Sequence, residues 1–180
     1  MASGTREALL DVAVRLLDAG GVEAVTLREV GRQAGVSHNA PYKHFASKEA
    51  LLAAVAAREL ERRAARPADP LRETLHSYVR WAQETPARFR LVFGPWSVDS
   101  PELHVAATAA QARLVDTVLA AQQADLLPAG DPVRLASLLR SLAHGAADLA
   151  SAGHLSPSGK GHASPEDLID DLLAYLNPRR

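Results

Sequence analysis

Apolar residues recur along the chain at intervals of three and four, and this spacing predicts helices almost throughout. Gly20-Gly21 ends a first helix whose inward face comprises Leu9, Val12, Ala13, Leu16 and Leu17. The same periodicity predicts eight further helices, at about residues 27–34, 38–44, 48–65, 71–84, 86–93, 101–124, 132–152 and 165–176. Strand-like runs of Val, Ile and Thr are absent. The predicted fold class is therefore all-α, with about nine helices.

Several helix starts are marked by a capping residue followed by proline, as at Asp69-Pro70, Ser100-Pro101, Asp131-Pro132 and Ser164-Pro165. Proline suits the first helical turn, because its missing N–H would have no intrahelical partner there. The preceding Asp or Ser side chain can accept a hydrogen bond from a free backbone N–H. These pairs place the starts of four helices.

Composition narrows the class of protein. The 180 residues are 47% hydrophobic and 23% charged, which fits one compact domain or two small ones and argues against disorder. The absence of cysteine excludes disulfides, thiolate metal sites and cysteine nucleophiles. The longest stretch without charge, 149–159, is too short to span a bilayer, and residues 1–5 lead into charges rather than an apolar signal core. We expect a cytoplasmic protein with no membrane partner.

Charge is unevenly spread along the chain. The net charge is −1, but residues 1–66 hold ten Lys or Arg against eight Asp or Glu. Within residues 26–48 four basic residues face Glu29 alone: Arg28, Arg32, Lys43 and Lys48. This local excess predicts a small anion-binding surface.

Residues 26–45, TLREVGRQAGVSHNAPYKHF, have the pattern of a helix-turn-helix. Thr26 and Glu29 match a capping box at the start of the first helix. Gly35 suits the turn, because glycine tolerates positive φ, and Ser37 is expected to cap the second helix. A plain helical hairpin in a bundle has the same spacing, so the pattern alone leaves both interpretations open.

The second helix of this motif has side chains suited to DNA. Its first residues are small or polar, which lets them approach base edges in the major groove: Ser37, His38, Asn39 and Ala40. Side chains suited to gripping phosphates follow, namely Tyr42, Lys43, His44 and Lys48. Pro41 is expected near the end of the first turn, at a cost of at most about one backbone hydrogen bond.

The segment resembles the DNA-binding signature of the tetracycline-repressor (TetR) family, T-x-R-E-V-x-x-x-A-G-V-S-x-x-x-x-Y-x-H-F-x-x-K-E-x-L, from Thr26 to Leu51. The resemblance implies a helix-turn-helix DNA-binding domain at 1–47 and a C-terminal ligand-binding and dimerisation domain at 48–180. It also implies a homodimeric transcriptional regulator, a repressor that binds a palindromic operator on double-stranded DNA and is released by a small-molecule effector.

Carried over by position, the resemblance places Thr26, Arg28, Tyr42 and Lys48 at phosphates. It places five residues in or beside the groove, namely Ser37, His38, Asn39, Ala40 and Lys43, and assigns Phe45 to the core. The C-terminal part is similar to a subgroup with a Trp-x-x-x-His-Gly pattern, of which His144 and Gly145 are present. Arg140 stands at the position of the tryptophan, which weakens any inference from that pattern.

Five of the eight aromatic residues lie between residues 78 and 96. The candidate ligand-binding residues are Tyr78, Trp81, Phe89, Phe93 and Trp96, together with His104 and His144. The same aromatic side chains also fit an ordinary core among alanine-rich helices. No metal site is predicted, because the histidines at 104, 144, 154 and 162 lack helical i,i+3 or i,i+4 spacing, and no cofactor is expected.

The last two predicted helices carry more apolar surface than one inward face requires. A second copy is expected to cover the excess as a four-helix bundle about a two-fold axis. The candidate dimer-interface residues are Leu135, Leu139, Leu142, Ala146, Leu149, Leu168, Leu172, Tyr175 and Leu176. The alternative is that both helices belong to the core of one chain.

An enzyme is disfavoured, because no nucleophile arrangement, phosphate loop or metal motif appears in the sequence. Two other functions stay open at this point. One is an activator or a regulator without a small-molecule ligand, and the other is a helical interaction protein that binds no DNA.

Overall fold

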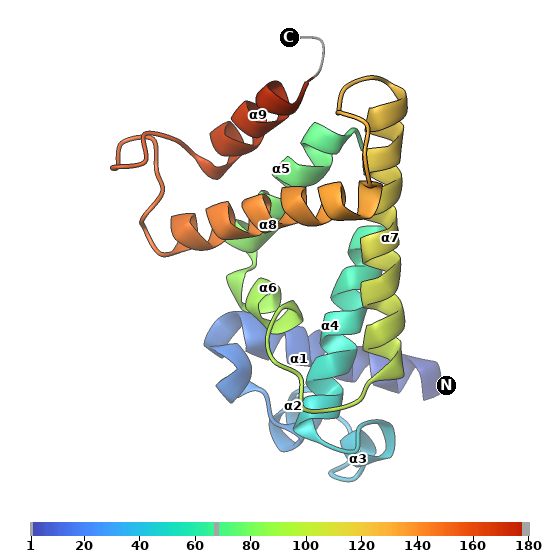
Figure 1. Ribbon diagram of the computed structural model, residues 1–180. Helices are drawn as coiled ribbons and strands as arrows, with labels where there is room; N and C mark the ends of the chain where they lie inside the picture. The colour runs from blue at the N-terminus through green and yellow to red at the C-terminus, as the bar shows by residue number, and fades with distance from the viewer. Residues whose placement is uncertain (1, 67–68, 178–180) are drawn as a thin grey trace. The chain divides into compact units, whose positions relative to one another are not determined.

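The computed structural model describes residues 2–66 and 69–177, and within them it contains helices and no strands (Figure 1). The described residues form nine helices: α1 Ala2–Ala24, α2 Leu27–Gln33, α3 Ala40–His44, α4 Lys48–Ala64, α5 Leu71–Glu84, α6 Pro86–Val92, α7 Pro101–Gln123, α8 Pro132–Ser151 and α9 Pro165–Leu176. The all-α fold class is confirmed. None of the described helices is long and apolar enough to cross a membrane.

The chain packs as two compact units that do not follow the sequence in simple order. Unit 1 comprises Met1–Ala65 and Thr85–Ala110, and unit 2 comprises Arg66–Glu84 and Gln111–Arg180. Helix α7 therefore contributes its first part to unit 1 and its second part to unit 2. The functional division expected between residues 47 and 48 concerns DNA binding rather than packing, and it stays a prediction.

Unit 1 is built around α1 and α4. Helices α1, α2, α4 and α6 bury a shared core that includes Leu9, Val30 and Leu51, all with no exposed surface. Phe45, which was assigned to the core, is only 4% exposed and joins it. The short α2 and α3 are thus held by apolar burial rather than by their own helix propensity.

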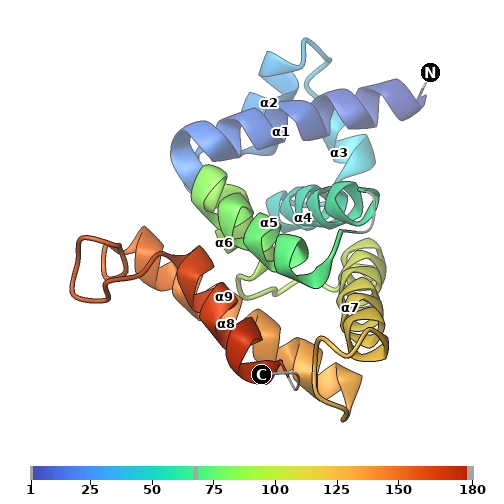
Figure 2. The same cartoon turned by 90° about the horizontal axis from the view of Figure 1, so that it is seen from above.

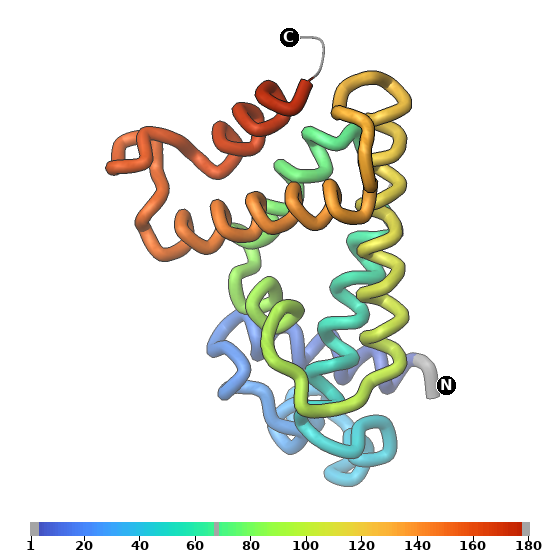
Figure 3. The backbone as a smooth tube through the Cα atoms, in the orientation of Figure 1, coloured from blue at the N-terminus to red at the C-terminus, as the bar shows by residue number. Residues whose placement is uncertain are grey.

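The break predicted at Gly20-Gly21 is present in the backbone. Gly20 and Gly21 leave the helical conformation, and Gly21 has a φ of 69°, in the left-handed region that glycine reaches without strain. One further turn follows to Ala24 before the chain enters α2, and Figure 3 shows the change of direction at the end of α1.

The start of α3 differs from the prediction. The helix begins at Ala40 instead of His38, and its N-cap is Asn39 rather than Ser37. The Ser37 carbonyl accepts a hydrogen bond from the Ala40 N–H at 2.9 Å, so a turn occupies the expected first residues. Pro41 is the cause: within the first helical turn its missing N–H costs no helical hydrogen bond.

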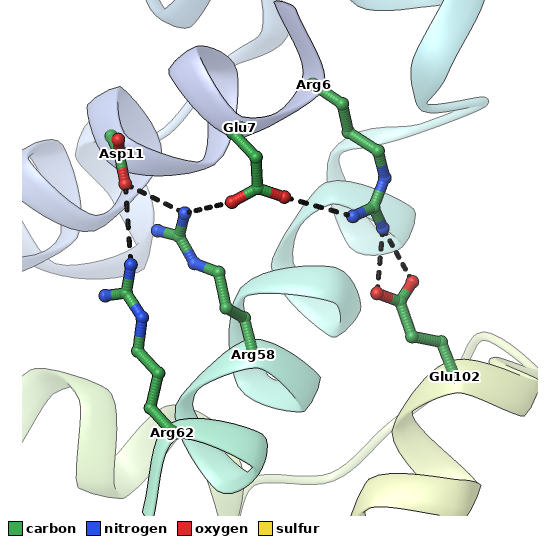
Figure 4. A network of polar contacts seen from close by, with 6 residues as sticks. All are labelled: Arg6, Glu7, Asp11, Arg58, Arg62 and Glu102. Carbon is green, nitrogen blue, oxygen red and sulfur yellow. Dashed lines mark hydrogen bonds and ion pairs between the residues drawn. The ribbon is translucent and has the colours of Figure 1, made fainter. Parts of the chain in front are cut away.

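A network of ion pairs joins α1 to α4 and α7 within unit 1 (Figure 4). Arg58 of α4 is 8% exposed, and its Nη1 donates to Asp11 at 2.8 Å and to Glu7 at 3.2 Å. Arg6 of α1 donates through Nη2 to both carboxylate oxygens of Glu102, at 2.9 and 2.7 Å. The buried guanidinium therefore depends on two carboxylates from a neighbouring helix.

Unit 2 is held together by α5, which packs against both α8 and α9. Val79 of α5, Leu139 of α8 and Ile169 of α9 are buried together in this unit, and Figure 2 shows α8 and α9 from above. The predicted caps are present: Asp131 accepts from the first backbone N–H groups of α8, and Ser164 forms a capping box with Asp167. The Arg140 Nη1 donates to Gln111 Oε1 at 2.6 Å, so this residue links α8 to α7.

Candidate nucleic-acid interface

The turn between α2 and α3 is set by local sequence. Thr26 Oγ1 accepts a hydrogen bond from the Glu29 N–H at 3.1 Å and so caps α2. Gly35 has a φ of 66°, as the turn was predicted to need. Pro41 is fully buried and faces Gly31 of α2, at which a Cβ would come within 2.7 Å of the proline Cγ. The absence of a side chain at Gly31 thus lets α3 approach α2 closely.

The residues predicted to contact DNA lie on either side of the buried Pro41 in the sequence. Tyr42 is 51% exposed, although Pro41 and Phe45 on either side of it are buried. The other exposed candidates are Thr26, Arg28, Ser37, His38, Asn39 and Lys43, whereas Ala40, His44 and Lys48 are half-buried. The motif therefore presents most of its predicted contact side chains to solvent on a fixed backbone.

The one carboxylate within residues 26–48, that of Glu29, is paired with side chains of its own helix. Glu29 accepts hydrogen bonds from Arg32 at 2.8 and 2.5 Å and from Gln33 at 2.7 Å. These bonds, the one from Arg32 above all, lower the pKa of Glu29 to about 2. Residues 34–48 contain no Asp or Glu. The surface around α3 is consequently suited to approach by phosphates.

The Glu29 pKa gives a first testable prediction. Because the folded pKa lies below the ordinary value, the stability contributed by this carboxylate is present above pH 4.5 and is lost as pH falls toward 2. We expect the Glu29 carboxyl resonance to titrate near pH 2 in an NMR pH series. In Arg32→Gln the midpoint should move up toward the ordinary value. An unchanged midpoint in that variant would show that Arg32 is not the cause.

Lys48 occupies a different setting from the other basic residues. It is the first residue of α4, after the N-cap Ser47, whose side chain accepts from the Ala50 N–H. Its Nζ lies 3.9 Å from Glu23 Oε2, and the Glu23 side chain is 96% exposed. This loose pair leaves the ammonium able to exchange its partner for another anion.

Comparison with known proteins identifies the fold and the motif. Residues 9–55 match the family description "Bacterial regulatory proteins, tetR family", and residues 71–175, more than half of the chain, match "Tetracyclin repressor-like, C-terminal domain". The chain belongs to the TetR family. Both descriptions are of regulators, which agrees with the prediction that the protein is not an enzyme.

Individual relatives match over limited lengths. The chain is 38% identical over 78 residues to the HTH-type transcriptional regulator AcrR of Shigella flexneri, covering 39% of this chain and 36% of that protein. It is 40% identical over 65 residues to the HTH-type transcriptional repressor KstR of Rhodococcus jostii (strain RHA1), covering 36% and 31%. The chain thus matches about a third of the length of these curated relatives.

A solved structure matches over almost the whole chain. It is a protein of unknown function from Rhodococcus sp. RHA1, which is 29% identical and has a TM-score of 0.75, covering 96% of this chain and 93% of that one. The likeness extends to both units of this TetR-family chain, whereas the curated relatives match much shorter stretches.

The seven ligand-binding candidates are divided between the two units. Tyr78, Trp81 and His144 lie together in unit 2, where the Tyr78 hydroxyl is 2.9 Å from His144 Nδ1 and its ring is edge-on to Trp81. Unit 1 holds the other four: Phe89, Phe93, Trp96 and His104. Phe89 is buried against Phe93, with ring centroids 5.0 Å apart, and His104 is exposed on α7.

Each unit contains a cavity that the sequence analysis did not predict. In unit 2 a cavity of about 620 Å³ lies among α5, α7, α9 and the loop after α7, with Leu71, Arg113, Leu127 and Leu173 in its wall. None of the seven candidates lines it. In unit 1 a cavity of about 530 Å³ includes Trp96 alone of the seven. Within the described residues no group of three or more His, Asp or Glu side chains is placed to hold a metal ion.

The dimer-interface candidates also separate by burial. Leu139 and Ala146 are 1% and 4% exposed, so their side chains already pack within one chain and leave little surface for a partner. Periodicity could not distinguish the two faces of α8, because both are apolar. The half-buried candidates are Leu135, Leu142, Leu168, Leu172 and Leu176. Leu149 and Tyr175 remain open, at 50% and 84% exposure.

Proposed function

We propose that this TetR-family regulator is a cytoplasmic repressor that binds a palindromic operator as a homodimer and leaves it when a small molecule binds. The single observation that carries the proposal is the arrangement of α3. It buries Pro41 and Phe45 while Tyr42, Lys43 and the preceding polar residues stay exposed, as a helix placed in a major groove requires. Among the relatives, the name of KstR includes the word repressor.

Apolar surface on α8 and α9 supports the dimer. Leu138 and Leu149 are 53% and 50% exposed, and Gly145, which lies between them on the same side of α8, has open space around its Cα. An exposed stripe of large and small residues lets a second helix approach closely. Two helix-turn-helix motifs related by a two-fold axis would then read two half-sites of one operator.

The cavity of unit 2 supports the proposal of a small-molecule effector. The unit 2 cavity has the size of a ligand pocket, and its mainly apolar wall carries a few polar groups, among them Arg113, Asp116 and Thr117. An effector that binds better to the non-DNA form shifts the equilibrium away from the operator only by that difference in affinity.

The test is fluorescence anisotropy of the protein on DNA from its own upstream region, against unrelated DNA, at several salt concentrations. We expect specific binding of two subunits per site with a steep salt dependence. Equal binding to both DNAs would place the operator elsewhere in the genome. A folded dimer that binds no duplex would contradict the proposal.

Lys43→Gln and Tyr42→Ala test the assigned surface. Each should weaken operator binding about tenfold, and Lys43→Gln should lower the salt slope by about one. The control is Lys160→Gln, an exposed lysine in the loop before α9. Thermal stability should stay unchanged in all three variants, because none of the side chains is buried. A loss of affinity that appears equally in the control would show a general charge effect.

Tyr175→Lys tests the dimer. Removing this 84% exposed side chain from α9 and adding a charge should raise the dimer dissociation constant about tenfold or more. Sedimentation velocity against concentration measures the change. Val105→Lys on α7, at a residue 66% exposed, is the matched control and should leave the dimer intact. A dimer unaffected by Tyr175→Lys would move the interface away from α9.

A further inference from the structure

The cavity of unit 1 combines apolar walls with an unengaged cation. Its walls include Leu17, Val22, Leu52, Leu91 and Trp96, and its polar groups include Lys48 and Arg90. The volume of about 530 Å³ falls within the range of small-molecule pockets. Both α1 and α4 contribute to it, and these helices share a buried core with α2 of the helix-turn-helix.

The charged side chains around the cavity differ in whether they have partners within the protein. Glu49 is held by hydrogen bonds from its own backbone N–H and from Ser47, which lower its pKa and keep it ionised at the start of α4. Glu23 is almost fully exposed and lies 3.9 Å from Lys48. Among the described residues, the Arg90 side chain has neither a hydrogen bond nor an ion pair, and it lies at the exposed edge of the cavity. Lys48 and Arg90 formally balance Glu23 and Glu49, and the Arg90 guanidinium is the basic group left to pair with a ligand carboxylate.

We propose that this cavity binds an amphipathic monocarboxylate, with its apolar body against Trp96 and its carboxylate on Arg90 and Lys48. A planar guanidinium can hold a carboxylate through two parallel hydrogen bonds, and Lys48 adds a second positive charge after releasing Glu23. An apolar chain or ring with one anionic end matches both parts of the cavity.

The position of Lys48 gives the site a consequence for DNA. Lys48 was assigned to an operator phosphate, and a ligand carboxylate would compete for the same ammonium. Ligand and DNA would then weaken each other's binding by the same factor. This consequence rests on the proposed function, whereas ligand binding itself does not.

Decanoate is the probe, and intrinsic tryptophan fluorescence and isothermal titration calorimetry are the measurements, without DNA. The chain has two tryptophans, Trp81 in unit 2 and Trp96 in this cavity. We expect decanoate to bind once per chain and to change the fluorescence. In Trp96→Phe the fluorescence change should disappear while calorimetry still detects binding. A change retained in that variant would place the ligand in unit 2 and overturn the proposal.

Charge recognition is tested by Arg90→Gln, with Arg15→Gln on the exposed side of α1 as the matched control. The loss of a charged hydrogen-bonding partner should weaken decanoate binding about tenfold or more, and the control should bind as wild type. Decanol and decyltrimethylammonium should bind at least tenfold more weakly than decanoate. Equal binding of decanol, or an unaffected Arg90→Gln variant, would overturn the assignment of the carboxylate.

The link to DNA is measured last, by titrating decanoate into the operator complex. We expect wild-type affinity for DNA to fall, and the Arg90→Gln variant to keep its affinity at the same decanoate concentration. Decanoate binding without any effect on DNA would remove the competition at Lys48 and leave the ligand site. A protein that binds decanoate but no duplex would contradict the proposed function alone.

Discussion

Gly31→Ala is expected to weaken operator binding about tenfold to hundredfold, although position 31 is buried inside α2. The added Cβ would lie 2.7 Å from Pro41 Cγ and 3.3 Å from Pro41 Cδ, well inside normal contact. Pro41 is itself fully buried, so the strain must move α3 relative to α2. A displaced recognition helix loses base contacts that contribute about 1–3 kcal/mol each.

The free energy of unfolding of Gly31→Ala gives a second, independent measure of the same overpacking. We expect urea denaturation to show a loss of about 1–3 kcal/mol in Gly31→Ala, because a close-packed site has no room for an extra methyl group. Gly4→Ala is the control in the same unit, since a Cβ there meets nothing within 4 Å. It should leave operator affinity unchanged and should not destabilise the fold. Full DNA affinity in Gly31→Ala would show that the α2–α3 contact is not needed for DNA binding.

The double variant Glu7→Gln, Asp11→Asn should destabilise unit 1 by about 2–3 kcal/mol. It leaves the buried Arg58 guanidinium without either carboxylate, and Arg58 Nη2 already has no hydrogen-bond partner among the described residues. Breaking a fully buried ion pair costs about 3–5 kcal/mol. We expect a smaller loss here because the carboxylates of Glu7 and Asp11 are half-exposed. Urea denaturation at neutral pH measures the difference.

Arg58→Met is the informative counterpart. It removes the charge but keeps an apolar stem of similar length, and the two carboxylates stay hydrated because Glu7 and Asp11 are 52% and 54% exposed. We therefore expect a change below about 1 kcal/mol. A larger loss in Arg58→Met than in the double variant would show that the ion pairs themselves stabilise the contact of α1 with α4 (Figure 4).

Local signals in the sequence located most helices and the turn of the motif. Periodicity and capping residues act over a few neighbouring residues, so Asp131, Ser164 and Gly35 could be assigned without tertiary information. The prediction of where α3 begins was wrong, and the reason is also local. Ser37 was predicted as the cap, but Pro41 lies in the first turn of a helix that begins at Ala40, and periodicity in a five-residue helix cannot fix its first residue.

The residues of the candidate DNA surface could be assigned from the sequence, whereas the cavities could not. The ten residues predicted to contact DNA lie close together in the sequence, and all of them fall within residues 26–48 of the helix-turn-helix segment. Cavity walls come from distant segments: Val22, Lys48 and Arg90 meet in unit 1 although more than twenty residues separate each from the next. An aromatic cluster in sequence therefore predicted a shared pocket for side chains that fold into different units.

The sequence by itself determined the helical fold class, the positions of most helices and the family, because each depends on short-range spacing. Only the tertiary structure decided which apolar faces are core and which remain open. Leu139 and Leu149 lie on the same helix with similar chemistry, yet one is 1% and the other 50% exposed. Burial depends on which distant helix packs against each face, and the neighbouring residues in the sequence do not indicate which helix that will be.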